Sequence, residues 1–107
     1  MNDRLLSLLG LARRAGKISL GNDPVLSSVQ GGKAKLVLVC PDLSKRTLKG
    51  IERSAKDFGV PLVTIKQSMD QVSMSLGKRC GVVSLDDAGF ARKALTLTET
   101  NGEDLIV

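Results

Sequence analysis

The sequence has no histidine, tryptophan or tyrosine and only two phenylalanines among its 107 residues. Without histidine it lacks the side chain that most often serves as a general base or as a metal ligand. With so few aromatic rings it also lacks the stacking platforms by which many proteins hold single-stranded nucleic acid. If nucleic acid is the partner, we therefore expect a structured one, recognised by its shape and its base edges.

Cysteine is scarce as well: Cys40 and Cys80 lie far apart in the chain, and no Cys-x-x-Cys motif is present. This spacing argues against a zinc site, and two isolated thiols fit the reducing cytoplasm. No apolar run approaches the ~18 residues that a membrane span requires. The N-terminal segment lacks a signal-peptide pattern, because Arg13 and Arg14 interrupt its apolar residues. We expect a cytoplasmic protein without a membrane segment.

The length suits one domain, which we expect to span residues 1–107 with an acidic tail at 98–107. Charge is distributed unevenly along it. Residues 1–56 hold 11 Lys or Arg and 4 Asp or Glu, whereas residues 57–107 hold 5 and 7, for a net charge of +5. Such asymmetry predicts a basic surface that faces a polyanion such as nucleic acid. Solubility alone is the other explanation.

Five segments show the apolar spacing of amphipathic helices, at about 2–15, 24–30, 45–58 and 69–76, with a last one that starts at Asp86 or Asp87. The expected caps of the first, third and fourth are Asn2 or Asp3, Ser44 and Ser68. The residues expected on their buried faces are Leu5, Leu6, Leu8, Leu9, Leu11 and Ala12; Val25, Leu26 and Val29; Leu48, Ile51, Ala55 and Phe58; Met69, Val72 and Leu76; and Phe90, Ala91, Ala94 and Leu95.

Apolar runs between these helices predict strands at 18–20, 36–39, 60–65 and 82–85. The run at 36–39 has no polar alternation, which is typical of an interior strand covered on both faces. Strands that alternate with helices predict an α/β fold, an α/β/α sandwich around a mixed or parallel sheet of about four strands. Whether Leu105, Ile106 and Val107 add an edge strand or fray is left open by the sequence.

Most of the functional argument rests on residues 21–42. Asp23 followed by Pro24 predicts a helix start, with Asp23 as the N-cap and Pro24 as the first helical residue. A helix start offers free backbone N–H groups and a partial positive charge, which suit an anion. Lys33 and Lys35 follow a Gly-Gly break, and they can either contact phosphates or be solvated residues beside a strand.

Two other basic groups have ordinary structural explanations. Cations near the end of the first helix suit its dipole, with ligand contact as the alternative; these are Arg13, Arg14 and Lys17. A stripe at helical spacing on the third helix is typical of a solvated face; it consists of Arg46, Lys49, Arg53 and Lys56. The first turn of that helix, with Lys45 and Arg46, stays a contact candidate.

The residues give little support to catalysis, because no serine or cysteine can have a histidine partner. Gly10, Gly16 and Gly21 are too widely spaced for a dinucleotide-binding or phosphate-binding loop. Asp86 and Asp87 could form a carboxylate pair, but a helix cap beside an acidic neighbour explains them. We expect no enzyme activity, no cofactor and no metal site.

Several short motifs, taken together, resemble one family. They are Gly21-Asn22-Asp23, Gly32-Lys33-Ala34-Lys35-Leu36-Val37, Cys40-Pro41-Asp42, Gly59-Val60-Pro61 and Gly77. As a set they are similar to the kink-turn-binding ribosomal-protein superfamily. The opening run at 8–17 resembles its bacterial, YlxQ-like branch. The resemblance covers about residues 2–97 and implies a three-layer α/β/α sandwich that binds kink-turn RNA or related tandem sheared G·A motifs.

The resemblance also implies which residues meet the RNA. The family signature is Gly-x-Asn-Glu at the start of the second helix, with a Lys one turn later. Gly21 matches its glycine, and a strict alignment then puts Asp23 on the Asn, Pro24 on the Glu and Ser27 on the Lys. A shift of one residue instead pairs Asn22 and Asp23 with the Asn and the Glu. Both alignments leave the signature altered.

The resemblance implies two further contact regions, the turn after the strand at 36–39 and the loop after Gly77. It also implies that one family contact is absent here, because Met69 stands where the family has a basic residue. The expected RNA-binding residues are Gly21, Asn22, Asp23, Lys33, Lys35, Ser44, Lys45, Leu48, Lys78 and Arg79. We expect a non-catalytic, monomeric, ribosome-associated protein that clamps structured RNA, ribosomal RNA included. The alternative is a protein-interaction module on the same fold that binds an acidic partner through its basic face.

Overall fold

Helices and strands alternate through the part of the chain that the computed structural model describes, residues 3–103, with side chains described through residue 98. In chain order they are α1 (Arg4–Arg14), β1 (Ile18–Leu20), α2 (Asn22–Gln30), β2 (Leu36–Val39), α3 (Lys45–Asp57), β3 (Leu62–Thr64), α4 (Met69–Leu76), β4 (Val82–Leu85) and α5 (Ala88–Glu103). None of the described helices is both long and apolar enough to cross a membrane.

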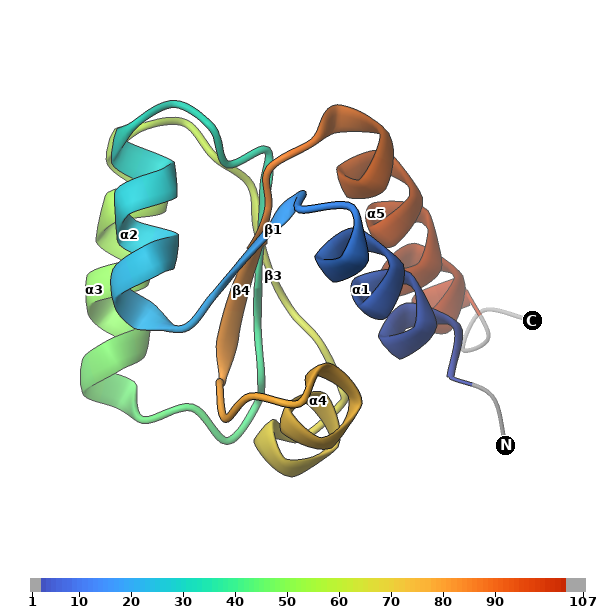
Figure 1. The fold of residues 1–107 in the computed structure, drawn as a ribbon. Coiled ribbons are helices and arrows are strands. Elements are labelled where there is room, and N and C mark those ends of the chain that lie inside the picture. Colours follow the sequence, from blue (N-terminus) through green and yellow to red (C-terminus); the bar gives the residue numbers. More distant parts are fainter. Residues whose placement is uncertain (1–2, 104–107) are drawn as a thin grey trace.

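The strands form one mixed sheet in the order β1-β4-β2-β3. β4 pairs antiparallel with both β1 and β2, whereas β3 pairs parallel with β2. Helices α2 and α3 cover one face of this sheet, and α1 and α5 cover the other, with α4 at its lower end (Figure 1). The three-layer α/β/α sandwich is thereby confirmed, and so is β2 as an interior strand, since all of its residues are buried.

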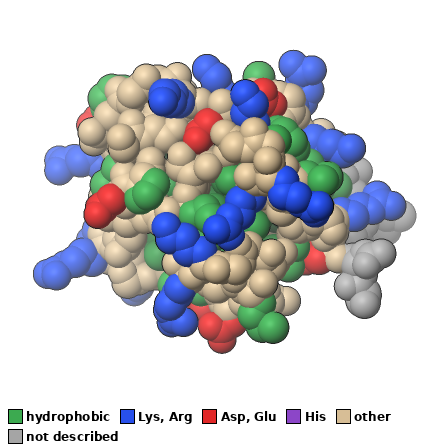
Figure 2. Space-filling view, viewed as in Figure 1, with side chains coloured by type: hydrophobic (Ala, Val, Ile, Leu, Met, Phe, Trp, Pro, Cys, Tyr) green, Lys and Arg blue, Asp and Glu red, His purple; other side chains and the backbone are tan. Residues whose placement is uncertain are grey.

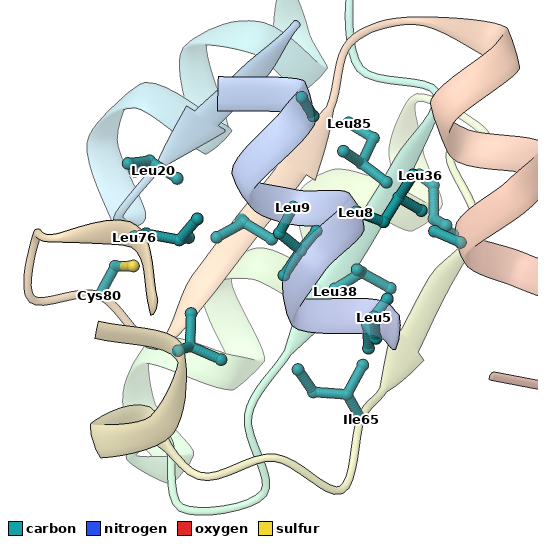
Figure 3. Close-up of a cluster of buried hydrophobic side chains, with 14 of the residues drawn as sticks. Leu5, Leu8, Leu9, Leu20, Leu36, Leu38, Ile65, Leu76, Cys80 and Leu85 are labelled. Carbon is teal, nitrogen blue, oxygen red and sulfur yellow. The ribbon is translucent and has the colours of Figure 1, made fainter. Parts of the chain in front are cut away.

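Two apolar clusters hold the layers together, one on each face of the sheet. In the first, Leu5, Leu8 and Leu9 of α1 lie against the sheet residues Leu36 and Leu38 (Figure 3). In the second, Val25 and Val29 of α2 and Ile51 of α3 pack on the opposite face of the sheet, against Val37 and Val39 of β2. Because β2 contributes alternate side chains to both clusters, it needs the continuous apolar run that its sequence shows.

Three apolar residues expected on buried helix faces are exposed: Leu11 and Phe58 each expose 52% of their surface, and Leu95 exposes 36%. Phe58 is the C-cap of α3, with φ −103° and ψ 7°, so the helical spacing that predicted its direction has ended there. Leu11 falls outside the narrower buried stripe of α1, which is formed by Leu5, Leu8, Leu9 and Ala12.

The helix starts follow the expected side-chain caps, with one exception described below. Asp3 caps α1, Ser44 caps α3, and Ser68 forms a capping box with Gln71 at the start of α4. Asp87 caps α5, since its carboxylate accepts the Phe90 amide at 3.0 Å. Helix α5 continues to residue 103, within the segment expected as a tail, and the apolar end at 105–107 lies outside the described residues.

Asp86 has a different role from its neighbour. Its carboxylate accepts hydrogen bonds from the hydroxyls of Ser19 at 2.6 Å, Ser28 at 2.7 Å and Ser84 at 2.8 Å. These serines belong to β1, α2 and β4. Asp86 therefore fastens α2 to the β1 side of the sheet, which sets where both ends of α2 lie.

Candidate nucleic-acid interface

Three connections meet at the edge of the sheet where β4 begins. The Gly21 amide donates to the Val82 carbonyl at 2.9 Å, and the Cys40 amide donates to the Gly81 carbonyl at 2.9 Å. β4 lies between β1 and β2, so the ends of those two strands flank its first residue. The start of α2, the turn into α3 and the loop from α4 to β4 are thereby brought together, at the lower edge in Figure 1.

Helix α2 begins at Asn22, with Gly21 as its N-cap, so the expected start at Asp23 and Pro24 is wrong. Pro24 is the third helical residue; a proline fits there because the amides of a first turn have no partner within the helix. Gly21 has φ +95°, a conformation that favours glycine and aims the chain from β1 into α2. No side chain caps this start, and Asn22 and Asp23 are both exposed.

The turn from β2 into α3 is fixed by hydrogen bonds at both of its ends. Ser44 accepts the Thr47 amide at 3.3 Å, and Asp42 accepts the Met69 amide at 3.0 Å at the start of α4. Lys45 is exposed in the first turn of α3, whereas Leu48 is half-buried against the cluster beneath α2 and α3. Of the expected contacts in this turn, Ser44 and Lys45 thus present polar groups and Leu48 presents part of an apolar side chain.

The loop from α4 to β4 is anchored at one end and open in its middle. The Cys80 amide donates to the Ser73 hydroxyl at 3.0 Å, and the Cys80 side chain is buried. Lys78 and Arg79, directly before it, are exposed. Gly81 has no room for a side chain, since an added Cβ would lie 2.8 Å from Leu43 and 2.9 Å from Met69. Met69 therefore packs beneath the loop.

Arg13, for which the sequence left both a helix-dipole role and ligand contact open, is a further candidate. One of its terminal guanidinium nitrogens lies 3.5 Å from the point where a Cβ on Gly77 would sit. Its charge, like that of Lys78, lowers the pKa of Cys80 against the larger effect of burial, which raises that pKa. Figure 2, which shows the molecule from the same side as Figure 1, has Lys and Arg side chains gathered near the middle of the visible face. Because α1 and α4 are distant in sequence, only the packing of α1 on α4 reveals this neighbour.

Lys33 and Lys35 do not join these residues. The Lys35 amide donates to the Leu85 carbonyl at 2.8 Å, which places Lys35 beside the last residue of β4. Lys33 lies beyond the C-terminal end of α2, and nine helical residues span about 13 Å. The ten expected contact residues therefore fall into two groups at opposite ends of α2.

The cysteines lie behind this edge and are poor nucleophiles. Burial, with smaller contributions from Asp42 and Cys80, raises the pKa of the Cys40 thiol from 9.0 to about 12. Burial also raises the pKa of Cys80. Both thiols are therefore neutral near pH 7. Among the described residues, no group of three or more His, Cys, Asp or Glu side chains could hold a metal ion.

Comparison with known proteins identifies several similar sequences, two of them covered almost completely by this chain. The "RNA-binding protein YlxQ" of Bacillus subtilis is 37% identical over 93 residues, which cover 86% of this chain and 92% of that protein. The protein of the same name from Enterococcus faecium is 32% identical over 96 residues, covering 90% and 92%. The "Large ribosomal subunit protein eL8" of Thermoplasma volcanium is 29% identical over 85 residues, covering 78% and 66%.

Solved structures share the fold. A protein from Bacillus halodurans C described as having unknown function superposes with a TM-score of 0.85 at 30% identity, covering 92% of this chain and 99% of that one. The Giardia lamblia 15.5kD RNA binding protein superposes with a TM-score of 0.75 at 22% identity, covering 94% and 92%. The model of the Ribosomal protein L7Ae/L30e/S12e/Gadd45 family matches residues 3–95. This chain belongs to that family, as its motifs predicted.

Proposed function

We propose that this protein binds structured RNA without catalysing a reaction, and that it holds a kink-turn or a similar motif. The observation that carries the proposal is the edge described above, where an uncapped helix start meets three basic segments. Those segments supply Arg13, Lys45, Lys78 and Arg79, which belong to α1, α3 and the loop before β4. The family and the names of its relatives support the same conclusion.

The start of α2 can serve both phosphate and base recognition. Its first amides lack partners within the helix, and the helix dipole adds partial positive charge, so a phosphate oxygen is stabilised there. Asn22 can donate and accept, and the Asp23 carboxylate can accept the hydrogens on N1 and N2 of guanine. Because these two exposed residues open the helix, we pair them with the Asn and the Glu of the family signature.

The surrounding cations act mainly through charge. A kinked RNA crowds phosphates together, and each Lys or Arg that neutralises one releases counterions and strengthens binding. The two exposed residues Lys78 and Arg79 extend from a loop that Cys80 and Gly81 hold in place. The same edge therefore supplies general affinity through its cations and discrimination through Asn22 and Asp23.

The central experiment titrates a kink-turn RNA against a control RNA whose sheared G·A pairs are replaced by Watson–Crick pairs, at one fixed salt concentration. We expect tighter binding to the kink-turn. Replacing Asn22 and Asp23 by alanine should remove most of that preference. Its expected size is about 1–3 kcal/mol of binding free energy, the discrimination that a pair of hydrogen bonds to a base edge provides. Equal affinity of the unmodified protein for both RNAs would reduce the proposal to general polyanion binding.

A charge-matched pair of variants tests the loop. Lys78→Ala with Arg79→Ala should weaken binding of both RNAs and flatten the salt dependence by about one unit of slope per removed contact. Lys49→Ala with Arg53→Ala removes the same charge from the exposed stripe of α3 and should change little. Similar losses in both variants would remove the loop from the site. If neither RNA binds the unmodified protein, an acidic protein partner is favoured instead.

We also propose that the RNA is ribosomal and that binding takes place in the cytoplasm. A large-subunit protein among the relatives supports a ribosomal target. Two free cysteines, both buried, fit a reducing compartment. Co-sedimentation of the protein with ribosomal particles in cell extract, lost in the Lys78 and Arg79 double variant, is the expected result.

A further inference from the structure

A second basic surface lies away from the edge just described. An open hollow of about 830 Å³ runs between β1 and α2, which pack side by side (Figure 1). Its lining consists of Gly16, Lys17, Ile18, Ser19, Pro24, Ser27, Ser28, Gly31, Lys33, Lys35 and Asp86. We call it the α2–β1 groove. It includes Lys33 and Lys35, the two expected contacts that lie at the far end of α2.

Three lysines surround the far end of the groove, and each is held through its backbone. The Lys17 carbonyl accepts the Asp86 amide at 2.8 Å, and the Lys35 amide donates to Leu85 at 2.8 Å. The Lys33 amide donates to the Ser28 carbonyl at 2.9 Å. All three lysines are exposed. Fixed backbones with free ammonium groups suit phosphate contacts, for which lysine acts as a point charge.

The α2 side of the groove is lined by small groups. Along α2 the spacing of Pro24, Ser27 and Gly31 puts small residues on the face toward β1. Asp86 contributes a carboxylate, but three serine hydroxyls already donate to its oxygens, and three lysines outnumber it. The path therefore leads from Pro24, next to Asp23, to the lysines along a wall of small residues and with net positive charge at its end.

We propose that an RNA strand flanking the motif held at the start of α2 runs through the α2–β1 groove, with its phosphates on Lys17, Lys33 and Lys35. This inference rests on the proposed function. The hollow has the volume of pockets that hold one drug-sized ligand, which suits a single strand. No aromatic ring lines it, so the contact is to the backbone and independent of base sequence.

The spacing of the lysines favours a polymer over a small phosphate compound. Lys17 precedes β1 and Lys35 precedes β2, and β4 lies between these two strands. Two interstrand spacings separate their backbones by about 10 Å. Lysines spread over this distance can each contact a different phosphate of one strand.

The test compares the kink-turn RNA alone with the same RNA carrying a single-stranded extension at either end. An extension of about six nucleotides exceeds the ~13 Å of α2 at about 3.4 Å per nucleotide. The extension that enters the α2–β1 groove should tighten binding about tenfold at low salt. It should also steepen the dependence of log affinity on log salt concentration by about 2, the value for three phosphate contacts on a single strand.

The variant Lys17→Ala, Lys33→Ala, Lys35→Ala should lose this gain while binding the unextended RNA almost as well as the unmodified protein. The charge-matched control is Lys49→Ala, Arg53→Ala, Lys56→Ala on the exposed face of α3, which should keep the gain. Melting followed by circular dichroism should show that both variants fold. A mononucleotide at micromolar concentration should not abolish the gain.

Three results would overturn the inference and leave the proposed function intact. They are an equal affinity for extended and unextended RNA, a gain that survives loss of the three groove lysines, and a gain that a micromolar mononucleotide removes. If the unextended kink-turn RNA itself does not bind, the proposed function fails, and the inference fails with it. The unextended RNA thus separates the two failures.

Discussion

The stability of the site should depend on Asp86, although Asp86 lies outside the edge that we propose for RNA. Its carboxylate is the acceptor for Ser19, Ser28 and Ser84. In the Asp86→Ala variant these hydroxyls lose their acceptor, and Ser28 and Ser84 expose only 6% and 0% of their surface. A buried polar group without a partner costs about 1–3 kcal/mol. We therefore expect a loss of about 2–6 kcal/mol, with Ser19 free to turn toward water.

The asparagine variant should be milder, because of how the two carboxylate oxygens are used. Oδ1 accepts both Ser28 and Ser84, whereas Oδ2 accepts Ser19. In Asp86→Asn the amide oxygen can take the place of Oδ1 and keep both buried bonds. Only the extra strength of a charged acceptor is lost, about 1 kcal/mol per bond, so we expect a loss of about 1–2 kcal/mol.

Urea denaturation followed by far-UV circular dichroism measures these differences, because the chain has no tryptophan or tyrosine to report by fluorescence. A double variant sharpens the test: Ser84→Ala added to Asp86→Ala removes an orphaned hydroxyl and should recover part of the stability. The reasoning is refuted if Asp86→Ala costs less than about 1 kcal/mol. It also fails if the asparagine variant is as unstable as the alanine variant.

Two further predictions concern the sheet edge behind the loop. Gly81→Ala should lower the free energy of unfolding by about 1–3 kcal/mol, because the added Cβ overpacks Leu43 and Met69. Gly50→Ala should instead stabilise the protein, because Gly50 lies in α3 and its added Cβ has nothing within 4 Å. Equal melting temperatures of the two variants would contradict this prediction. The pKa of Cys40 is 9.0 when unperturbed and about 12 in the fold. The unfolded chain alone therefore ionises this thiol between those values, and stability falls as pH rises above 9.0, by about 1.4 kcal/mol at pH 10. Under reducing conditions, the difference in free energy of unfolding between the unmodified protein and Cys40→Ala should therefore decrease by about 1.4 kcal/mol from about pH 8 to about pH 10. A difference that stays constant over this range would contradict the raised pKa of Cys40.

Local sequence signals predicted the elements because burial and caps act over short distances. The apolar run of β2 and the four-residue spacing of Val25 and Val29 reflect which faces are covered, and both predictions are confirmed. Ser44 and Ser68 cap the helices that follow them, as expected, because a cap involves only the next three residues. Where a helix turned out differently, at Asn22 and Phe58, the error lies at a terminus.

The arrangement of the site could not be predicted in the same way, because it depends on contacts between distant segments. Ser19 and Asp86 are 67 positions apart, and nothing in the local pattern distinguished Asp86 from Asp87. Likewise, Arg13 meets the loop after Gly77 only through the packing of α1 on α4. Lys33 follows the start of α2 closely in sequence, yet the helix itself carries it about 13 Å away.

The altered signature at α2 changes where the positive charge is found. In the register that we propose, with Asn22 and Asp23 on the Asn and the Glu of the signature, the signature's lysine falls on Leu26, which is partly buried against the cluster beneath α2 and α3. Pro24 also removes one of the first-turn amides, and the Val25 amide bonds to the Gly21 carbonyl at 3.1 Å. In our proposals, positive charge instead comes from both ends of α2, from the loop cations beside its start and from the lysines beyond its end. RNA binding would then depend less on α2 itself and more on the sheet, because β4 fixes the two groups of cations relative to each other.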